Sequence, residues 1–336
     1  WGPPFIDTEG ERSAAYFHSC NRGKRSIVAD FATERGREIV RRLAARSDVL
    51  IENFKVGGLK KFGLDYESLK PLNPRLIYCS VTGFGQTGPY AKRAGYDFLI
   101  QGMSGVMDIT GDPAGSPQKA GIAISDLFTG LLGVVAVEAA LIARERSGKG
   151  QHIDLSLFDS MSAMLANQAM NYLASGQSPN RMGNAHVNLA PYQTLPVADG
   201  WLIVAVGNDG QFARLCGVLG LESMASDPRF AANPGRVTNR VEMERRLVEK
   251  TRLWKRDDLL AALEKAVVPA GPINTIGDLF ADPQFKARGM RIEPQGTPGI
   301  RSPILMSDNP LTLERRSPRL GEHQAEILRE IGLQES

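Results

Sequence analysis

One carboxylate, Asp126, stands at the start of an almost wholly apolar stretch, residues 127–143, in which Glu138 is the one charged residue. A carboxylate beside buried apolar surface loses hydration, which costs free energy unless the group is paired, hydrogen-bonded or used. A carboxylate that is used there is a candidate catalytic group. Asp also suits an N-cap, because it accepts a hydrogen bond from the first helical turn. Taken alone, the position favours the cap, so other parts of the chain must decide.

Glycine marks a second candidate region, residues 82–90, where three of nine positions are glycine. Such a loop is either a connection of several turns or a place where the backbone comes close to a ligand, and its composition leaves both open. Asp159 is another acidic residue near the end of an expected strand, and there a cap or turn role is favoured. The histidines and cysteines lack the spacing of a metal site, so we predict no metal. They are His18, His152, His186, His323, Cys20, Cys79 and Cys216.

Composition favours two folded domains. The chain has 336 residues, of which 42% are hydrophobic and 23% charged, enough to bury a large core. Its 40 Lys and Arg are spread out and nearly balanced by 37 Asp and Glu, so we expect no nucleic-acid binding. Residues 127–143 are short for a membrane span and contain Glu138 and two glycines, so we expect a buried central helix and no membrane. An odd number of cysteines without metal spacing predicts a reducing, cytoplasmic compartment.

The first half of the chain alternates strand and helix patterns, which is typical of a parallel sheet with covering helices. In such a sheet ligands bind beyond the carboxyl ends of the strands, here at Asp30, Asn53 and the loop 82–90. A long helix is expected from Asp126 to Ser147. The expected strands are 26–30, 48–53, 75–81 and 151–157, and the shorter helices are 34–46 and 66–69.

The second half predicts a smaller α+β domain. Strand patterns at 192–197 and 201–206 flank a short turn that ends in Gly200, which is a hairpin signal. Helical patterns follow at 211–219, 240–249 and 257–266, and a last helix is expected at 320–331, with a stripe of Leu320, Ile327, Leu328 and Ile331. We predict three parts: a large domain over 1–185, a small domain over 186–295, and a C-terminal segment over 296–336 that returns to the large domain.

Several motifs together resemble the family III coenzyme A transferases, over nearly the whole length of the chain. Each motif alone is weak, but their order and spacing make the set specific. The motifs are residues 21–27, 52–55, 73–80, 83–90, 94–97, 147–151, 269–274 and 320–323.

The resemblance implies an α/β fold with a Rossmann-like large domain, a parallel sheet and a smaller α+β domain. It also implies ring-shaped subunits in an interlocked homodimer. The family's catalytic residue is an aspartate, and Asp126 in the motif 124–130 occupies its place. That aspartate attacks an acyl-CoA thioester, forming first a mixed anhydride and then an aspartyl-CoA thioester. Coenzyme A thioester is therefore a substrate, and no permanently bound cofactor is expected.

Residues that match the family's coenzyme contacts fall in three short segments and at one lysine. Among them Lys55, Lys61 and Arg93 suit the phosphates of the coenzyme. Asp97 matches an acidic position near the family's active site and is given a supporting role. The matching contacts are Ala29, Asp30, Phe31, Ala32, Asn53, Phe54, Lys55, Lys61, Arg93, Ala94, Gly95 and Tyr96.

Two departures from the family pattern matter. Family members usually begin with a further strand and helix upstream of Trp1, so we expect that N-terminal segment of the large domain to be missing here. The polyglycine loop of formyl-CoA transferases is also missing, and 206–210 is its nearest substitute. Formyl-CoA and oxalate are therefore disfavoured as substrates.

Three functions remain in competition. The first is transfer of coenzyme A from an acyl-CoA, with succinyl-CoA favoured, to a small dicarboxylate such as glutarate, whose distal carboxylate would be bound by Arg181, Asn184 and His186. The second is a 2-methylacyl-CoA racemase, a class in which a His stands where Tyr96 precedes Asp97. The third is an acyl-CoA-binding protein without catalysis.

Overall fold

The computed structural model describes residues 2–8 and 10–334, which form two compact units. The first unit takes its residues from 1–97, 125–160 and 276–336, and the second from 98–124 and 161–275. The chain therefore passes between the units several times. This division places 161–185 with the second unit and 276–295 with the first, whereas the sequence predicted boundaries at 185 and 295. The three-part division of the sequence stays a prediction.

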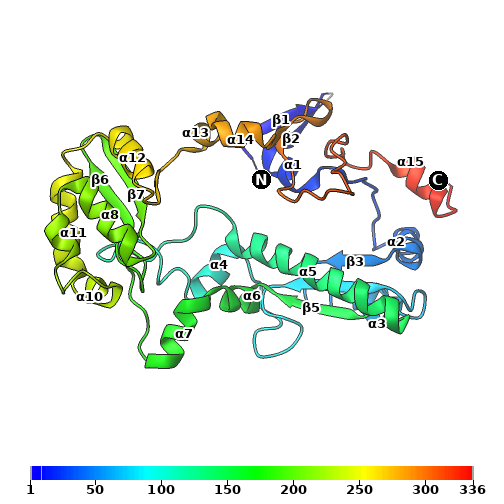
Figure 1. The fold of residues 1–336 in the computed structure, drawn as a ribbon. Helices are drawn as coiled ribbons and strands as arrows, with labels where there is room; N and C mark the ends of the chain where they lie inside the picture. The colour runs from blue at the N-terminus through cyan, green and yellow to red at the C-terminus, as the bar shows by residue number, and fades with distance from the viewer. Residues whose placement is uncertain (1, 9, 335–336) are drawn as a thin grey trace. The chain divides into compact units, whose positions relative to one another are not determined.

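A three-stranded parallel sheet is the centre of the first unit (Figure 1). Its order is β3 (Val49–Glu52), β4 (Ile77–Thr82), β5 (His152–Ser156), with Leu50 opposite Tyr78 and Cys79 opposite Ile153. These three strands and the helices α2 (Glu34–Arg46) and α3 (Tyr66–Leu69) were predicted from the sequence, and all five elements are confirmed. The side chains of β4 are buried at Ile77 to Ser80, as expected for a central strand.

The predicted strand at 26–30 is wrong, because this segment is extended but pairs with no other strand. Its backbone groups are bonded to the start of the last helix instead. The Ser26 amide donates to His323 Nδ1 (3.2 Å), and the Val28 amide donates to Gln324 Oε1 (2.8 Å). Side chains nearly 300 positions away thus take the place of a neighbouring strand.

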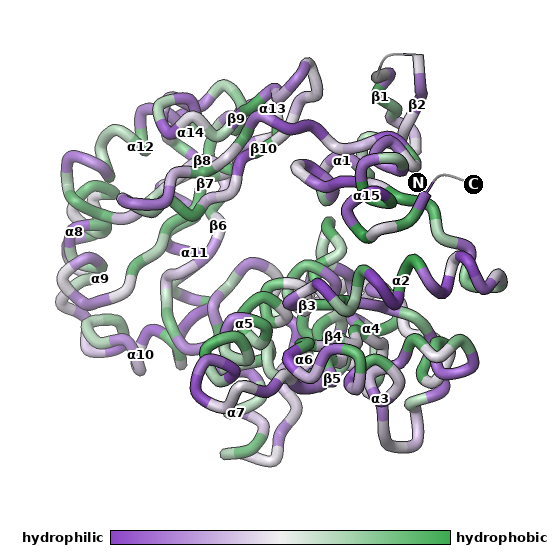
Figure 2. Tube along the Cα trace, turned by 90° about the vertical axis from the view of Figure 1, so that its right-hand side faces the viewer, coloured by the Kyte–Doolittle hydropathy of each residue, from purple (hydrophilic) through white to green (hydrophobic). Residues whose placement is uncertain are grey.

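The long helix α5 (Ile124–Ser147) crosses the sheet of the first unit and is largely hydrophobic (green in Figure 2). Near its C-terminus, the buried Arg144 pairs with Asp48 (2.9 Å) and donates to the Arg75 carbonyl (3.1 Å). The expected burial of this helix is wrong for the single chain, because Leu131 and Val134 are each 58% exposed. Among the described residues, α5 alone has the length and hydropathy to cross a membrane, a test that core helices of soluble proteins also pass.

The first unit also contains a two-stranded hairpin near each end of the chain and several short helices. The last helix, predicted at 320–331, covers only Gln324–Glu330, and Ile327, Leu328 and Ile331 are buried whereas Leu320 is exposed. The remaining elements of this unit are β1 (Phe5–Thr8), β2 (Glu11–Ala14), α1 (Ala15–Asn21), η1 (Lys60–Phe62), α13 (Ile276–Ala281), α14 (Pro283–Ala287), β9 (Arg291–Ile292), η2 (Pro294–Gly296), β10 (Gly299–Ile300) and α15 (Gln324–Glu330).

The second unit is built on the predicted hairpin. Strands β6 (Tyr192–Val197) and β7 (Gly200–Ala205) are antiparallel, and β8 (Ala270–Pro272) pairs with β7. One face of this sheet packs on helices through the fully buried Leu195 and Leu202. The helices of this unit are α7 (Ala166–Ser175), α8 (Asp209–Leu219), α9 (Glu222–Ala225), α10 (Asn233–Thr238), α11 (Arg240–Thr251) and α12 (Arg256–Lys265), while α4 (Asp97–Met103) and α6 (Leu157–Met164) begin in the first unit and end in the second.

Candidate active site

Asp126 lies in the first turn of α5, because the helix begins at Ile124. The N-cap interpretation of Asp126 is therefore wrong. Asp97 supplies the carboxylate that the start of the helix needs: its Oδ1 accepts hydrogen bonds from the Ser125 amide (2.9 Å) and the Ser125 hydroxyl (2.6 Å). No hydrogen bond or ion pair to Asp126 is found among the described residues. Its carboxylate is left available for chemistry.

The surroundings of Asp126 favour its protonated form. Asp126 itself is exposed, but its neighbours on the same turn, Ser125 and Thr129, are fully buried. Loss of hydration near this buried turn raises the pKa of Asp126, and the negative charge of Asp97 raises it further. A more basic carboxylate oxygen is a better nucleophile toward a carbonyl carbon. The two aspartates thus have different surroundings: Asp97 is hydrogen-bonded to Ser125, and Asp126 has no partner among the described residues.

The glycine-rich loop 82–90 touches the segment that carries Asp97. A Cβ on Gly83 would lie 2.5 Å from the Cα of Gly95, and a Cβ on Gly95 would lie 2.4 Å from the Cα of Gly83. No side chain fits at either position, so both must be glycine. The close backbone approach left open by the sequence is present, and it joins the end of β4 to the residues just before Asp97.

Asp154 of β5 holds the same loop and was not singled out from the sequence. Its carboxylate accepts from the Gln86 amide at 3.0 and 3.1 Å, and the Phe158 amide donates to the Gly83 carbonyl (3.0 Å). The loop is therefore fixed at the carboxyl ends of both β4 and β5. The strand pattern alternates polar and apolar residues, so Asp154 looked like an ordinary solvent-facing position.

The predicted coenzyme contacts at residues 93–96 lie on the segment just before Asp97, which touches the loop 82–90. The Arg93 guanidinium stacks 4.5 Å from the ring centre of Tyr90 and 5.5 Å from that of Phe84. Aromatic rings hold it in place and leave its charge open to solvent. Ala94 and Gly95 follow, and the Tyr96 side chain is 71% exposed. These residues share the neighbourhood of Asp97 and Asp126.

Of the other predicted coenzyme contacts, Phe31, Phe54 and Lys61 come together at the carboxyl end of β3, whereas Ala29 packs on the buried cluster that contains Ile39 and Leu328. The ring of Phe31 lies 5.7 Å from that of Phe54 and 5.9 Å from that of Phe62, and the Lys61 ammonium is 4.7 Å from the Phe62 ring centre. Phe62 was missed by the sequence reading. The remaining predicted contacts are Asp30, whose Oδ1 accepts from the Ala32 amide at 2.9 Å, and the exposed Asn53 and Lys55.

Asp159, the alternative nucleophile, lies in the first turn of α6 and its amide donates to Ser156 Oγ (3.1 Å). Among the described residues, no group of three or more His, Cys, Asp or Glu side chains is arranged to hold a metal ion.

The three candidates for the distal carboxylate of the acceptor lie in the second unit and differ in their surroundings. Arg181 has two buried nitrogens, Nε and Nη1, without a hydrogen-bond partner among the described residues. Asn184 donates to Thr194 Oγ1 (3.3 Å). His186 Nδ1 accepts from the Asn188 and Leu189 amides (3.0 and 3.1 Å), which stabilises a turn. Of the three, Arg181 alone has buried donors without a partner among the described residues.

Arg240 is a further cation in this part of the second unit, and the sequence reading missed it. Its Nη2 donates to the His186 carbonyl (2.7 Å), while its Nη1 is buried without a partner among the described residues. Burial lowers the pKa of this guanidinium. As the first residue of α11 it looked like an ordinary helix-surface cation.

This chain belongs to CoA-transferase family III, whose family model matches residues 1–324. It is accordingly a coenzyme A transferase, and the family resemblance seen in its motifs is confirmed. The succinate–glutarate CoA-transferase of Agrobacterium fabrum is 59% identical over 98% of this chain and 84% of its own length. The succinyl-CoA:glutarate CoA-transferase of Mus musculus is 39% identical over 98% of this chain and 76% of its own length.

Solved structures agree with the α/β fold, with its parallel and antiparallel sheets. The crystal structure of a CaiB/BaiF family protein from Brucella suis matches with a TM-score of 0.89 and 68% identity, covering 98% of this chain and 88% of that one.

Replacing Asp126 by Ala is expected to abolish acyl exchange, because the nucleophile is lost, and to change the free energy of unfolding by no more than about 0.5 kcal/mol, since no partner is lost with it. A coenzyme exchange assay and thermal unfolding of the same preparation measure the two effects. Asp159→Ala is the matched control and should keep turnover. Full exchange by Asp126→Ala, or loss of exchange in Asp159→Ala alone, would show the assignment to be wrong.

Proposed function

We propose that this enzyme transfers coenzyme A from succinyl-CoA to glutarate, with Asp126 as the nucleophile. The relatives named above support the two acids by their names. One observation carries the proposal for Asp126: its carboxylate has no hydrogen bond among the described residues, whereas the neighbouring Asp97 accepts two hydrogen bonds from Ser125. A racemase would need a His next to Asp97 as its second base, and Tyr96 stands there. An acyl-CoA-binding protein without catalysis would not need the reactive carboxylate.

The first half of the reaction moves coenzyme A onto the enzyme. An Asp126 oxygen attacks the thioester carbonyl of succinyl-CoA, the C–S bond breaks, and coenzyme A leaves as the thiolate. The thiolate then attacks the Asp126 carbonyl carbon of the resulting anhydride and releases succinate. Asp126 is left as a thioester of coenzyme A, and each step exchanges one acyl bond for another.

The second half reverses these steps with the acceptor. A glutarate carboxylate attacks the Asp126 thioester, giving a new mixed anhydride and the thiolate. Attack of the thiolate on the glutaryl carbonyl releases glutaryl-CoA and restores the Asp126 carboxylate. Water must be kept away throughout, because it would hydrolyse the anhydride or the thioester.

We propose that the group around Phe31 and Lys61 binds the nucleotide end of the coenzyme. The Phe54 ring is half exposed and offers a face on which adenine can stack. The exposed Lys55 and Lys61 provide ammonium groups for the phosphates. Arg93 would bind another anionic group of the substrate, nearer to the thioester, because stacking on Tyr90 fixes its side chain without neutralising its charge.

We also propose that the enzyme is a homodimer, with the ring-shaped, interlocked subunits that the family resemblance implies. The exposed apolar side chains of α5 follow a helical stripe made by Leu127, Leu131, Val134, Val135 and Ile142. Glu138, also exposed, lies between Val135 and Ile142, so the apolar surface runs from Leu127 to Val135. Exposed apolar surface of this kind marks an interface in soluble proteins. A second copy of the chain would cover it.

Incubation with succinyl-CoA alone is expected to leave a covalent adduct, because the first half of the reaction needs no acceptor. Hydroxylamine should convert the adduct to a hydroxamate, and peptide mass spectrometry should locate it at Asp126. Asp126→Ala treated in the same way is the control. Repeated trapping that finds no modified carboxylate in an enzyme that turns over would contradict the covalent route.

Sedimentation velocity without detergent should give the mass of a dimer. Leu131→Asp should weaken the dimer strongly, because it buries a charge in the stripe, whereas Val241→Asp, at an exposed apolar position of α11, should not. An active wild-type monomer would refute the dimer.

The enzyme should prefer glutarate to a monocarboxylate of equal length, and Arg181→Ala should reduce this preference by about tenfold, since a charge-assisted hydrogen bond is lost. The measurement is kcat/KM for glutarate and pentanoate. Asn184→Ala is the control for the same segment, because its amide is already bonded to Thr194. Equal kcat/KM values for the two acids would contradict the preference, and an unchanged ratio in Arg181→Ala would exclude Arg181.

A further inference from the structure

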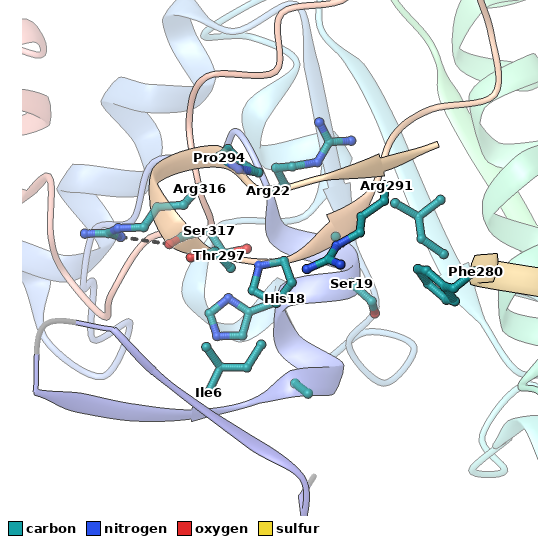
Figure 3. A pocket seen from close by; sticks show the side chains of 14 residues that line it. Ile6, His18, Ser19, Arg22, Phe280, Arg291, Pro294, Thr297, Arg316 and Ser317 are labelled. Carbon is teal, nitrogen blue, oxygen red and sulfur yellow. Dashed lines mark hydrogen bonds between the residues drawn. The ribbon is translucent and has the colours of Figure 1, made fainter. Parts of the chain in front are cut away.

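A cavity of about 480 Å³ lies within the first unit, between α1, the hairpin β9-β10 and the segment around Ser317 (Figure 3). Its size is that of a site for a small organic molecule, for which roughly 300–1,000 Å³ is usual. None of the residues assigned above to acyl transfer or coenzyme binding lines it. The cavity therefore calls for an explanation of its own.

The charged side chains that line this cavity are all cationic, with no Asp or Glu among the lining residues. Arg316 is paired with Glu322 (2.9 Å), and Arg291 is paired with Glu293 (3.2 Å). Both glutamates lie outside the lining. Arg22 makes no hydrogen bond or ion pair with another residue that the structure describes. Among the described residues, Arg22 is thus the one cation of the cavity wall without an acidic partner.

Two buried polar atoms at the cavity also lack a partner among the described residues. His18 is 7% exposed, and its Nε2 lies 2.7 Å from Ser13 Oγ while its Nδ1 is unbonded. Ser317 is 2% exposed, and its hydroxyl is unbonded. Buried polar atoms nearly always have a hydrogen-bond partner. In the tautomer in which Ser13 donates to Nε2, the ring proton of His18 is on Nδ1, and Nδ1 and the Ser317 hydroxyl are then both donors that require an acceptor.

Most of the remaining wall is apolar, with the hydroxyls of Ser19 and Thr297 as its other polar groups. Ile6 lies beside the His18 ring and Phe280 lies at the far end of the cavity, while Arg291 reaches in from β9 toward Ser19 (Figure 3). Ile300 adds a further aliphatic side chain to the lining. A ligand that fits this wall has an anionic end and a short hydrocarbon part.

We propose that this cavity binds a small organic anion, whose carboxylate accepts hydrogen bonds from His18, Ser317 and Arg22 and whose hydrocarbon part packs on Ile6, Phe280 and Ile300. A carboxylate has two oxygens with enough acceptor positions for three donors. It also supplies the single negative charge that Arg22 lacks. This ligand site is additional to the acyl-transfer site, and its existence does not depend on the proposed reaction.

Calorimetric titration of the whole protein with hexanoate and with hexanamide, its neutral counterpart, tests the proposal. Hexanamide should bind at least about tenfold more weakly, and Arg22→Gln should weaken hexanoate binding by about tenfold, since each removes a charge-assisted hydrogen bond. Ser317→Ala should weaken it less, because only a neutral donor is lost. Arg12→Gln is the control, since Arg12 stacks on Phe5 (4.3 Å) and does not line the cavity.

Crystals soaked with 6-bromohexanoate locate the ligand directly. Anomalous signal in the cavity, with the carboxylate within hydrogen-bond distance of His18 and Ser317, supports the proposal. Bromine signal found only elsewhere would overturn the proposal. Equal affinity of the wild-type protein for hexanoate and hexanamide would overturn it too, and so would equal affinity of Arg22→Gln and Arg12→Gln for hexanoate. Inorganic phosphate that binds as tightly as hexanoate would also overturn it, because the site would then hold an ion without regard to its hydrocarbon part.

Discussion

The hydrogen bonds from Ser125 to Asp97 are the interaction on which the candidate active site depends. They satisfy the amide at the start of α5 with a carboxylate from another segment. If Asp126 had to cap its own helix, hydrogen bonds would stabilise its charge and make it a weaker nucleophile. Because Asp97 takes the capping role, Asp126 stays unbonded while its position in the first turn is fixed. The contact between Gly83 and Gly95 then ties this arrangement to the end of β4.

The same arrangement explains the electrostatics of the pair. Loss of hydration raises the pKa of Asp126, and the negative charge of Asp97 raises it further. Asp97 accepts hydrogen bonds from Ser125, whereas Asp126 has no donor among the described residues. Two like charges whose environments differ are a common way to give two carboxylates separate tasks. Here one carboxylate positions the helix and the other is made more basic. In the proposed reaction, Asp126 attacks a thioester and later leaves from an anhydride, and both steps depend on the basicity of its carboxylate.

Local patterns were predictable from the sequence, and contacts between distant segments were not. The helix Glu34–Arg46 and the hairpin of β6 and β7 follow from periodicity and a turn signal, and both are confirmed. The strand at 26–30 was wrong because its partners, His323 and Gln324, lie nearly 300 positions away. The cap was wrong for the same reason, since Asp97 and Ser125 are 28 positions apart. The motifs indicated the proposed coenzyme contacts. Only the structure shows that the Phe62 ring packs against one of them, Phe31.

The apolar character of α5 links the fold to the chemistry. By composition the helix suits a core, yet in the single chain Leu131 and Val134 are largely exposed. Asp126, the proposed nucleophile, lies at the end of this surface, and an anhydride formed there would be open to water. In the proposed dimer, the second copy would bury the stripe and would also reduce the access of water to Asp126. The apolar sequence after Asp126 would then serve both assembly and catalysis. This would explain why the helix is so hydrophobic although many of its side chains are exposed in the single chain.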